Sequence, residues 1–295
     1  MKKNRVILVS IVSNGVLIVF KIIAGILMGS VAVLSEAIHS SIDLLAAVVA
    51  YIAIINSDQP ADSKHPFGHG KFENISGFFE ALLIFFAAGI IAAEAVHKLI
   101  NPHAAIVRLD WGIGVMAISA AVNVAVSRML FYSAKKYGSI AIEADAMHLG
   151  ADVMTSVGVM LGLVAIRFSH LVVLDPLIAI AVAGLILRAS INLTRRSIAD
   201  LADQKLPDGE IGVIETIIHG YPEITSYHKL RTRKSGSRRE IDLHIRVDGN
   251  TSLTVAHELC FKVENAVKVA FPGAYVTIHV EPGRGEPSEK KSIDT

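Results

Sequence analysis

The chain has 295 residues, of which 52% are hydrophobic and 19% are charged, and its mean hydropathy of +0.52 is that of a membrane protein rather than of an ordinary soluble domain. The net charge of +1 excludes a general nucleic-acid binder, which would need a basic excess. The single cysteine, Cys260, excludes a disulfide framework or a thiolate metal cluster, so any metal chemistry must use histidine and carboxylate ligands.

Six apolar segments are long enough to cross a hydrocarbon layer of ~30 Å, which needs about 20 helical residues. The first follows basic residues, as in a signal peptide, but it lacks a small-residue cleavage site, so we interpret it as a retained span. Lys21, inside this span, is predicted to extend toward the outer interface. The predicted transmembrane helices cover residues 6–28, 32–55, 76–99, 111–133, 142–168 and 172–193.

The basic residues outside these spans are distributed unequally. Only Lys98, Arg108 and Arg167 lie on one side. The other side holds Lys2, Lys3, Arg5, Lys64, Lys71, Lys135, Lys136, Arg195 and Arg196. Because basic loops stay on the cytoplasmic side, we expect a multi-pass protein of the inner or plasma membrane with both termini in the cytoplasm.

Two ionisable pairs lie inside the apolar segments with identical spacing. His39 precedes Asp43 by four residues in the second segment, and His148 precedes Asp152 by four in the fifth, so each pair shares one helix face. Because an ionised group at bilayer depth costs about 2.5–3.5 kcal/mol, it normally faces a partner, a cavity or an ion. Two imidazoles and two carboxylates suit Zn²⁺; the alternative is polar hydrogen bonding between helices. Asp145, one turn before His148, is either a further ligand or a cavity-lining acid.

The polar segment between the second and third spans carries another candidate site. Asp62, His65 and His69 place one carboxylate and two imidazoles within eight residues, which suffices for a three-ligand metal site completed by water. Gly68 and Gly70 allow the tight backbone that such a site needs. The alternative is a solvated loop with incidental histidines, since the chain has twelve.

From Arg195 onward the hydropathy falls, and a soluble domain is predicted. A helix at 208–219 is followed by strand-like runs at 224–233 and 239–247, joined by a turn at 234–237. A helix at 252–270 and a strand at 274–282 complete the order αββαβ, an open sheet with helices on one face.

Alternation along the predicted strands separates an apolar face from a polar one. Ile241, Leu243, Ile245 and Val247 share the apolar face of their strand, and His244 lies opposite. The metal-ligand candidates of this domain are His228, His244, His279 and Glu281 from the strands, with His257 from the second helix.

These features together resemble the cation diffusion facilitator family of divalent-metal/proton antiporters, and its bacterial zinc/iron efflux branch in particular. The resemblance covers nearly the whole chain: six spans, the loop His65-Pro66-Phe67-Gly68-His69-Gly70-Lys71, the two His-x-x-x-Asp pairs and the αββαβ tail. It implies a homodimer with a ferredoxin-like cytoplasmic domain. It also implies a transport site of His39, Asp43, His148 and Asp152, a loop site of Asp62, His65 and His69, a binuclear cytoplasmic site of His228, His244, His257, His279 and Glu281, and an interlocking charge pair, Lys71 with Asp203.

The resemblance also gives the expected domain organisation. Residues 1–200 form a six-helix transport domain, 201–206 a linker, 207–283 a metal-binding and dimerisation domain, and 284–295 a disordered tail. The chain departs from the efflux branch at two positions. His39 stands where that branch often has Asp, and a histidine at this position is typical of zinc-selective members. Glu281 stands where Asp is usual.

We therefore expect a proton-coupled secondary transporter that exports Zn²⁺ from the cytoplasm, with Zn²⁺ also a regulatory ligand and protons as the counter-ion. Fe²⁺, Mn²⁺, Co²⁺ or Cd²⁺ is the alternative cargo, and a passive metal channel is an alternative mechanism. An intramembrane metalloprotease would need a His-Glu-x-x-His motif, which the sequence lacks, and an ATP-driven pump would need larger soluble domains.

Overall fold

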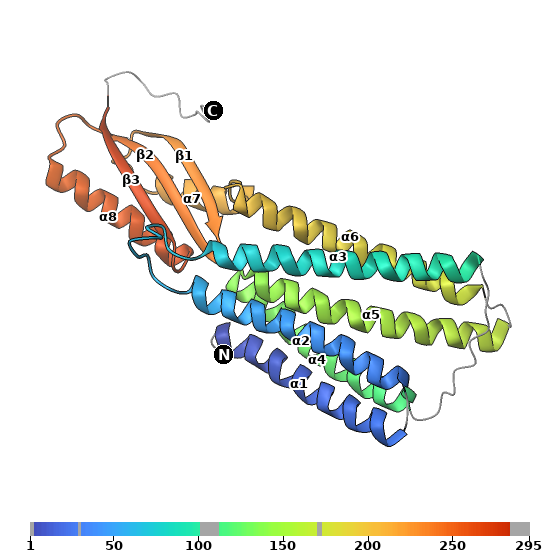
Figure 1. Ribbon diagram of the computed structural model, residues 1–295. Coiled ribbons are helices and arrows are strands. Elements are labelled where there is room, and N and C mark those ends of the chain that lie inside the picture. Colours follow the sequence, from blue (N-terminus) through green and yellow to red (C-terminus); the bar gives the residue numbers. More distant parts are fainter. Residues whose placement is uncertain (1–2, 29–30, 101–111, 170–172, 284–295) are drawn as a thin grey trace. The chain divides into compact units, whose positions relative to one another are not determined.

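The computed structural model describes residues 3–28, 31–100, 112–169 and 173–283 (Figure 1). The chain divides into two compact units, Met1–Ile198 and Ala199–Thr295. The predicted fold class, a helical membrane domain followed by an αββαβ domain, is confirmed. The segment 284–295, for which disorder was predicted, lies outside the described residues.

The first unit consists of long helices. They are α1 (Lys3–Met28), α2 (Val31–Ser57), α3 (Lys71–Ile100), α4 (Gly112–Tyr137), α5 (Ile140–Ser169) and α6 (Leu174–Leu201). At 1.5 Å per residue each is about 40 Å long, which exceeds the ~30 Å hydrocarbon thickness. Among the described residues, α1, α3, α4 and α6 contain apolar windows of membrane length. In α2 the described apolar stretch is shorter, Asp43–Ser57, so the crossings by α2 and α5 stay predictions.

Two helices, α3 and α6, extend furthest beyond the apolar segments that were predicted. α3 begins at Lys71 rather than at residue 76, and α6 continues to Leu201 rather than ending at 193. The first turn of α3 carries two buried polar residues, Glu73 and Asn74, and Glu73 accepts a hydrogen bond from Lys3 Nζ at 2.6 Å. Hydropathy alone marks only the apolar part of such a helix.

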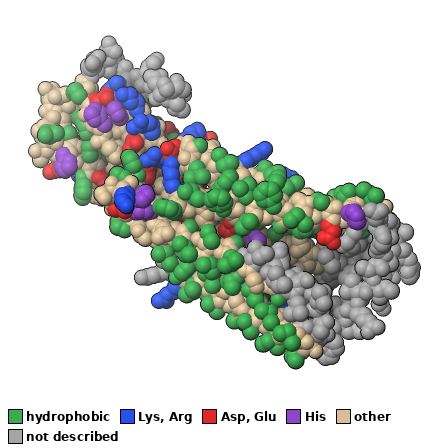
Figure 2. Space-filling view, viewed as in Figure 1, with side chains coloured by type: hydrophobic (Ala, Val, Ile, Leu, Met, Phe, Trp, Pro, Cys, Tyr) green, Lys and Arg blue, Asp and Glu red, His purple; other side chains and the backbone are tan. Residues whose placement is uncertain are grey.

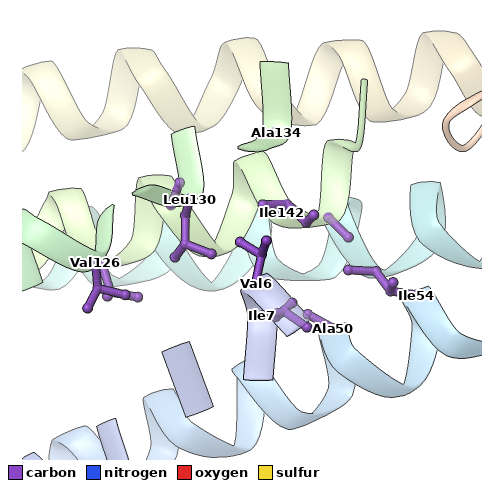
Figure 3. Close-up of a cluster of buried hydrophobic side chains, with 11 residues drawn as sticks. Val6, Ile7, Ala50, Ile54, Val126, Leu130, Ala134 and Ile142 are labelled. Atoms are coloured by element: carbon purple, nitrogen blue, oxygen red, sulfur yellow. The ribbon is translucent and has the colours of Figure 1, made fainter. Parts of the chain in front are cut away.

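An apolar core joins α1, α2, α4 and α5 (Figure 3). Val6 and Ile7 of α1 pack with Ile54 of α2, Leu130 of α4 and Ile142 of α5. Smaller clusters join α3 to α5 and α6. Many outward-facing side chains are also apolar, among them Val16, Leu45, Phe86 and Leu185, and hydrophobic side chains cover much of the visible helical surface in Figure 2. A surface of this kind suits contact with lipid.

The second unit has the predicted order αββαβ. Its elements are α7 (Asp208–His219), β1 (Ser226–Ser235), β2 (Arg238–Val247), α8 (Leu253–Ala270) and β3 (Tyr275–Pro282). The sheet order is β1-β2-β3, with β1 and β2 antiparallel and β2 and β3 parallel. The hairpin turn is tighter than predicted, because β1 ends at Ser235, β2 begins at Arg238 and Gly236 takes a positive φ of 60°.

Both helices of this unit cover the apolar face of the sheet. Ile241, Leu243 and Ile245 of β2 lie in one buried cluster with Ile214 of α7 and Val263 of α8. The alternation predicted for β2 is confirmed, because these residues are at most 1% exposed. The opposite face of the sheet remains free to carry polar side chains.

Candidate metal centres

Three of the four predicted intramembrane ligands come together between α2 and α5. His148 Nε2 lies 2.8 Å from Asp43 Oδ1, and both residues are 8% exposed. Asp152, one turn after His148 on α5, completes a group whose ligand atoms all lie within 4.8 Å of one another. His39 lies one turn before Asp43 on α2, but its side chain is outside the described part of the chain.

The contact between His148 and Asp43 determines what this group can do. A carboxylate only accepts hydrogen bonds, so His148 Nε2 must carry a hydrogen when it lies 2.8 Å from Asp43 Oδ1. A metal ion would need the same nitrogen without that hydrogen, since imidazole binds metals through a free lone pair. Proton and metal therefore exclude one another at His148.

The loop ligands Asp62, His65 and His69 also lie together. Asp62 Oδ1 lies 3.4 Å from His65 Nδ1, and Asp62 Oδ2 lies 3.4 Å from His69 Nε2. The centroids of the two imidazole rings are 4.3 Å apart. Asp62 Oδ1 also accepts the backbone amides of His65 at 2.6 Å and Lys64 at 2.9 Å, which fixes the turn. The hydrogen bonds from these amides, of which that of His65 has the largest effect, lower the pKa of Asp62 below its ordinary value.

The tautomer of His69 follows from its second contact. Its Nδ1 lies 3.2 Å from the carbonyl oxygen of Pro60, which can only accept, so Nδ1 carries the hydrogen. In the neutral ring Nε2 then presents its lone pair toward the Asp62 carboxylate. Two acceptors that face each other need a cation between them, so this loop is suited to a metal ion.

The histidines of the C-terminal unit form a row across its three strands. His228 of β1 pairs with His244 of β2, and His244 pairs with His279 of β3. Glu281 lies two residues further along β3, with Oε1 2.9 Å from His244 Nδ1 and Oε2 3.3 Å from His228 Nε2. His228, His244 and Glu281 form a possible ligand group, and His279 Nε2 lies 4.0 Å from Glu281 Oε1.

The electrostatics of this row favour a cation. The hydrogen bond from His244, aided by the charge on His228, lowers the pKa of Glu281 to about 2. Partial burial lowers the pKa of His228, because it disfavours the imidazolium form. Near neutral pH the row therefore offers an ionised carboxylate and a neutral imidazole, which are the metal-binding forms.

The predicted roles of His257 as a metal ligand and of Asp203 as a partner of Lys71 stay predictions. His257 lies on the exposed side of α8, next to the buried Ala256 that faces the sheet, and it is not part of the His228–His244–Glu281 group. Asp203 pairs with Arg233 Nη1 at 3.1 Å within its own unit. The pairing of Asp203 with Lys71 is untested.

Several buried charged groups were missed or misplaced by the sequence reasoning. Lys21 does not extend to the surface: it is 5% exposed and donates to Ser40 Oγ at 2.8 Å, because that hydroxyl supplies an acceptor inside the bundle. Glu80 of α3 was not identified, although an acid inside an apolar helix is itself a signal. It is 3% exposed, and Asp145 of α5 is 1% exposed.

Comparison with known proteins gives matches along almost the whole chain. The family described as cation efflux transmembrane domain matches residues 7–202, and the one described as cation efflux protein, cytoplasmic domain, matches residues 206–283. An uncharacterized transporter of Synechocystis sp., sll1263, is 38% identical over 258 residues, which are 86% of this chain and 82% of that protein. The cation-efflux pump FieF of Cronobacter sakazakii is 31% identical over 281 residues, 95% of this chain and 92% of the pump. The solved metal-bound C-terminal domain of the CzcD transporter from Thermotoga maritima is 32% identical; the match covers 26% of this chain and 93% of that one, with a TM-score of 0.25.

Proposed function

Since this chain belongs to the cation efflux family of membrane transporters and is not an enzyme, we propose that it exports a divalent transition metal, with Zn²⁺ as the preferred cargo, in exchange for protons. The observation that carries the proposal is the group formed by the buried Asp43 and His148 with the partly exposed Asp152 inside the helical unit. Two carboxylates and an imidazole at this depth need a cation or protons to balance their charge.

The exchange follows from the hydrogen bond between His148 and Asp43. When both ring nitrogens of His148 carry a hydrogen, a metal ion that enters from the cytoplasm takes the place of the Nε2 proton and also binds the carboxylate oxygens. The Nε2 proton leaves, and Nδ1 keeps its hydrogen. On the opposite side a proton returns to His148 and restores the 2.8 Å contact with Asp43.

The ligand types support Zn²⁺ over harder ions. A mixed set of imidazole and carboxylate ligands is typical of zinc, whereas Mg²⁺ and Mn²⁺ favour oxygen alone. His39 would add a second imidazole to the described group, one helical turn from Asp43. Fe²⁺, Co²⁺, Cd²⁺ or Mn²⁺ is the alternative cargo.

We further propose a homodimer in the cell membrane with both termini in the cytoplasm. The excess of basic residues on the side of the N-terminus supports this orientation, as does the match of residues 206–283 to a cytoplasmic domain. The loop site at Asp62 and the histidine row at Glu281 would bind cytoplasmic metal in this arrangement. Their role would be regulatory, since they lie outside the apolar helical segments.

Transport into proteoliposomes tests the proposal. Asp152→Ala removes a ligand from the buried group and is expected to abolish both Zn²⁺ uptake and the coupled proton flux. Glu94→Ala, which removes an exposed acid from α3, is the control and should transport normally. Unimpaired transport by Asp152→Ala would reject the site. Zn²⁺ flux in the wild type without proton counterflow would identify a channel instead.

A further inference from the structure

Glu80 is a buried acid that the exchange described above does not use. It lies on α3, its side chain is buried, and neither carboxylate oxygen has a hydrogen-bond partner among the described residues. Burial of an unpaired ionised carboxylate is far more costly than burial of the neutral acid. The environment of Glu80 therefore favours the protonated form.

The face of α3 that carries Glu80 points toward α5. Gly77, one turn earlier, lies so close to α5 that an added Cβ would be 3.3 Å from Ile140 Cγ2. Ala81, the next residue, is buried in a cluster with Ile140 and Ala144 of α5. Residues three or four apart share a helix face, so Glu80 is directed into the same contact.

Glu80 also lies at a similar depth to the transport group. It is nine residues from the start of α3, and His148 is eight residues from the start of α5, so both lie about 12–14 Å along helices that begin on the same proposed side. Asp145 and His148, both on α5, are ionisable groups within electrostatic range of Glu80. Glu80 forms no hydrogen bond with either of them, and one oxygen of Asp145 is also unpartnered.

We propose that Glu80 is a proton-carrying residue of the transport cycle, an inference that rests on the proposed exchange of metal for protons. With no metal beside His148, the Glu80 O–H bond is intact. When a divalent ion enters, its positive charge favours the carboxylate form. The O–H bond then breaks, the proton passes to solvent, and its electron pair stays on the carboxylate. After the ion leaves, a proton from the opposite side restores the O–H bond.

The number of protons exchanged per Zn²⁺ ion tests this role. Proteoliposomes containing the full chain are loaded with a pH-sensitive dye, and Zn²⁺ and proton fluxes are recorded together. Glu80→Gln is expected to move about one proton fewer per metal ion, because an amide carries no titratable proton. Glu80→Asp should restore the wild-type ratio. Glu94→Gln, an exposed position on the same helix, should leave the ratio unchanged.

A measurement on the wild type remains decisive where Glu80→Gln does not fold. Protein labelled with ¹³C-glutamate is expected to show an infrared C=O band of a protonated acid that disappears when Zn²⁺ is added. Glu281, with a pKa of about 2, contributes no such band near neutral pH. An unchanged proton ratio in Glu80→Gln, or the absence of the band, would overturn the role of Glu80. Absence of metal-coupled proton flux in the wild type would instead overturn the proposed exchange itself.

Discussion

Zinc is expected to stabilise the C-terminal domain through the histidine row. The fragment from Leu206 to Gly283 is suited to the test, because the buried cluster of this domain, from Leu206 to Ala274, contains no residue of the transmembrane unit. At a free Zn²⁺ concentration 100 times the Kd, binding to the folded form adds about 2.7 kcal/mol to the free energy of unfolding. Since about 1 kcal/mol shifts the Tm of a domain of this size by about 4–8 °C, the Tm should rise by about 10–20 °C.

The size of this shift should depend on pH in a defined direction. Metal binds neutral imidazole, and burial lowers the pKa of His228, so the zinc effect should persist somewhat below the ordinary histidine pKa of about 6.5 and should be lost as the pH falls toward about 5. The pKa of Glu281 is lowered to about 2. Its own contribution to stability is therefore present above its unfolded pKa and is lost only as the pH approaches 2. At about pH 5 the metal-free fold should thus persist while the zinc effect is gone.

Differential scanning calorimetry with and without Zn²⁺ measures both effects. Glu281→Gln keeps the shape of the side chain but removes its charge, so most of the zinc shift should be lost. Glu258→Gln, an exposed acid of α8 outside the row, is the matched control and should respond as the wild type does. A full zinc shift in Glu281→Gln, or an equal shift at about pH 5 and pH 7, would refute the reasoning.

Two further substitutions test the helical unit. His39→Asp should raise Mn²⁺ transport relative to Zn²⁺ in proteoliposomes, because carboxylate oxygen suits harder ions; an unchanged ratio would remove His39 from the selectivity argument. Glu73→Gln should lower the free energy of unfolding by less than the ~3–5 kcal/mol of a fully broken buried pair, because it removes the buried carboxylate 2.6 Å from the Lys3 ammonium while Asp58 Oδ1 remains 3.5 Å from it. Thermal unfolding in detergent measures this loss, and Glu143→Gln, which breaks the more exposed pair with Arg196, should cost only about 0–1 kcal/mol.

The C-terminal domain was predicted closely because local residues mark its element ends. Helix α7 has the predicted bounds, and α8 begins directly after Ser252, whose hydroxyl caps the helix by accepting the amide of Val255. The irregularity of β1 was not predicted. The register shifts between His228 and Arg231, and Lys229 takes a φ of 51°. Such a bulge depends on tertiary contacts, and nothing in strand alternation indicates it.

In the helical unit the sequence identified the apolar segments but not their polar ends. Glu73 in the first turn of α3 can be buried because Lys3, Ser57 and Ser139 all donate hydrogen bonds to it. These donors come from α1, from α2 and from the turn between α4 and α5, and they are far apart in sequence, so no local pattern indicates them. The same limit applies to Glu80, whose environment is formed by α5. By contrast, the four-residue spacing of His148 and Asp152 is a local property, and it led directly to the candidate transport group.

The three candidate metal groups each contain a carboxylate beside imidazole nitrogens, but they differ in burial. We expect this difference in burial to give them different roles. Each pairs a carboxylate with imidazole nitrogens: Asp43 with His148 at 2.8 Å, Glu281 with His244 at 2.9 Å, and Asp62 with His69 at 3.4 Å. Asp62 is exposed and its amide contacts lower its pKa, so it stays ionised and binds metal without releasing a proton of its own. Asp43 and His148 are buried, where low dielectric strengthens every charge interaction and makes an uncompensated charge costly. Only there must each departing metal ion be replaced by protons, so we expect coupling to arise at the buried group while the exposed groups respond to metal concentration.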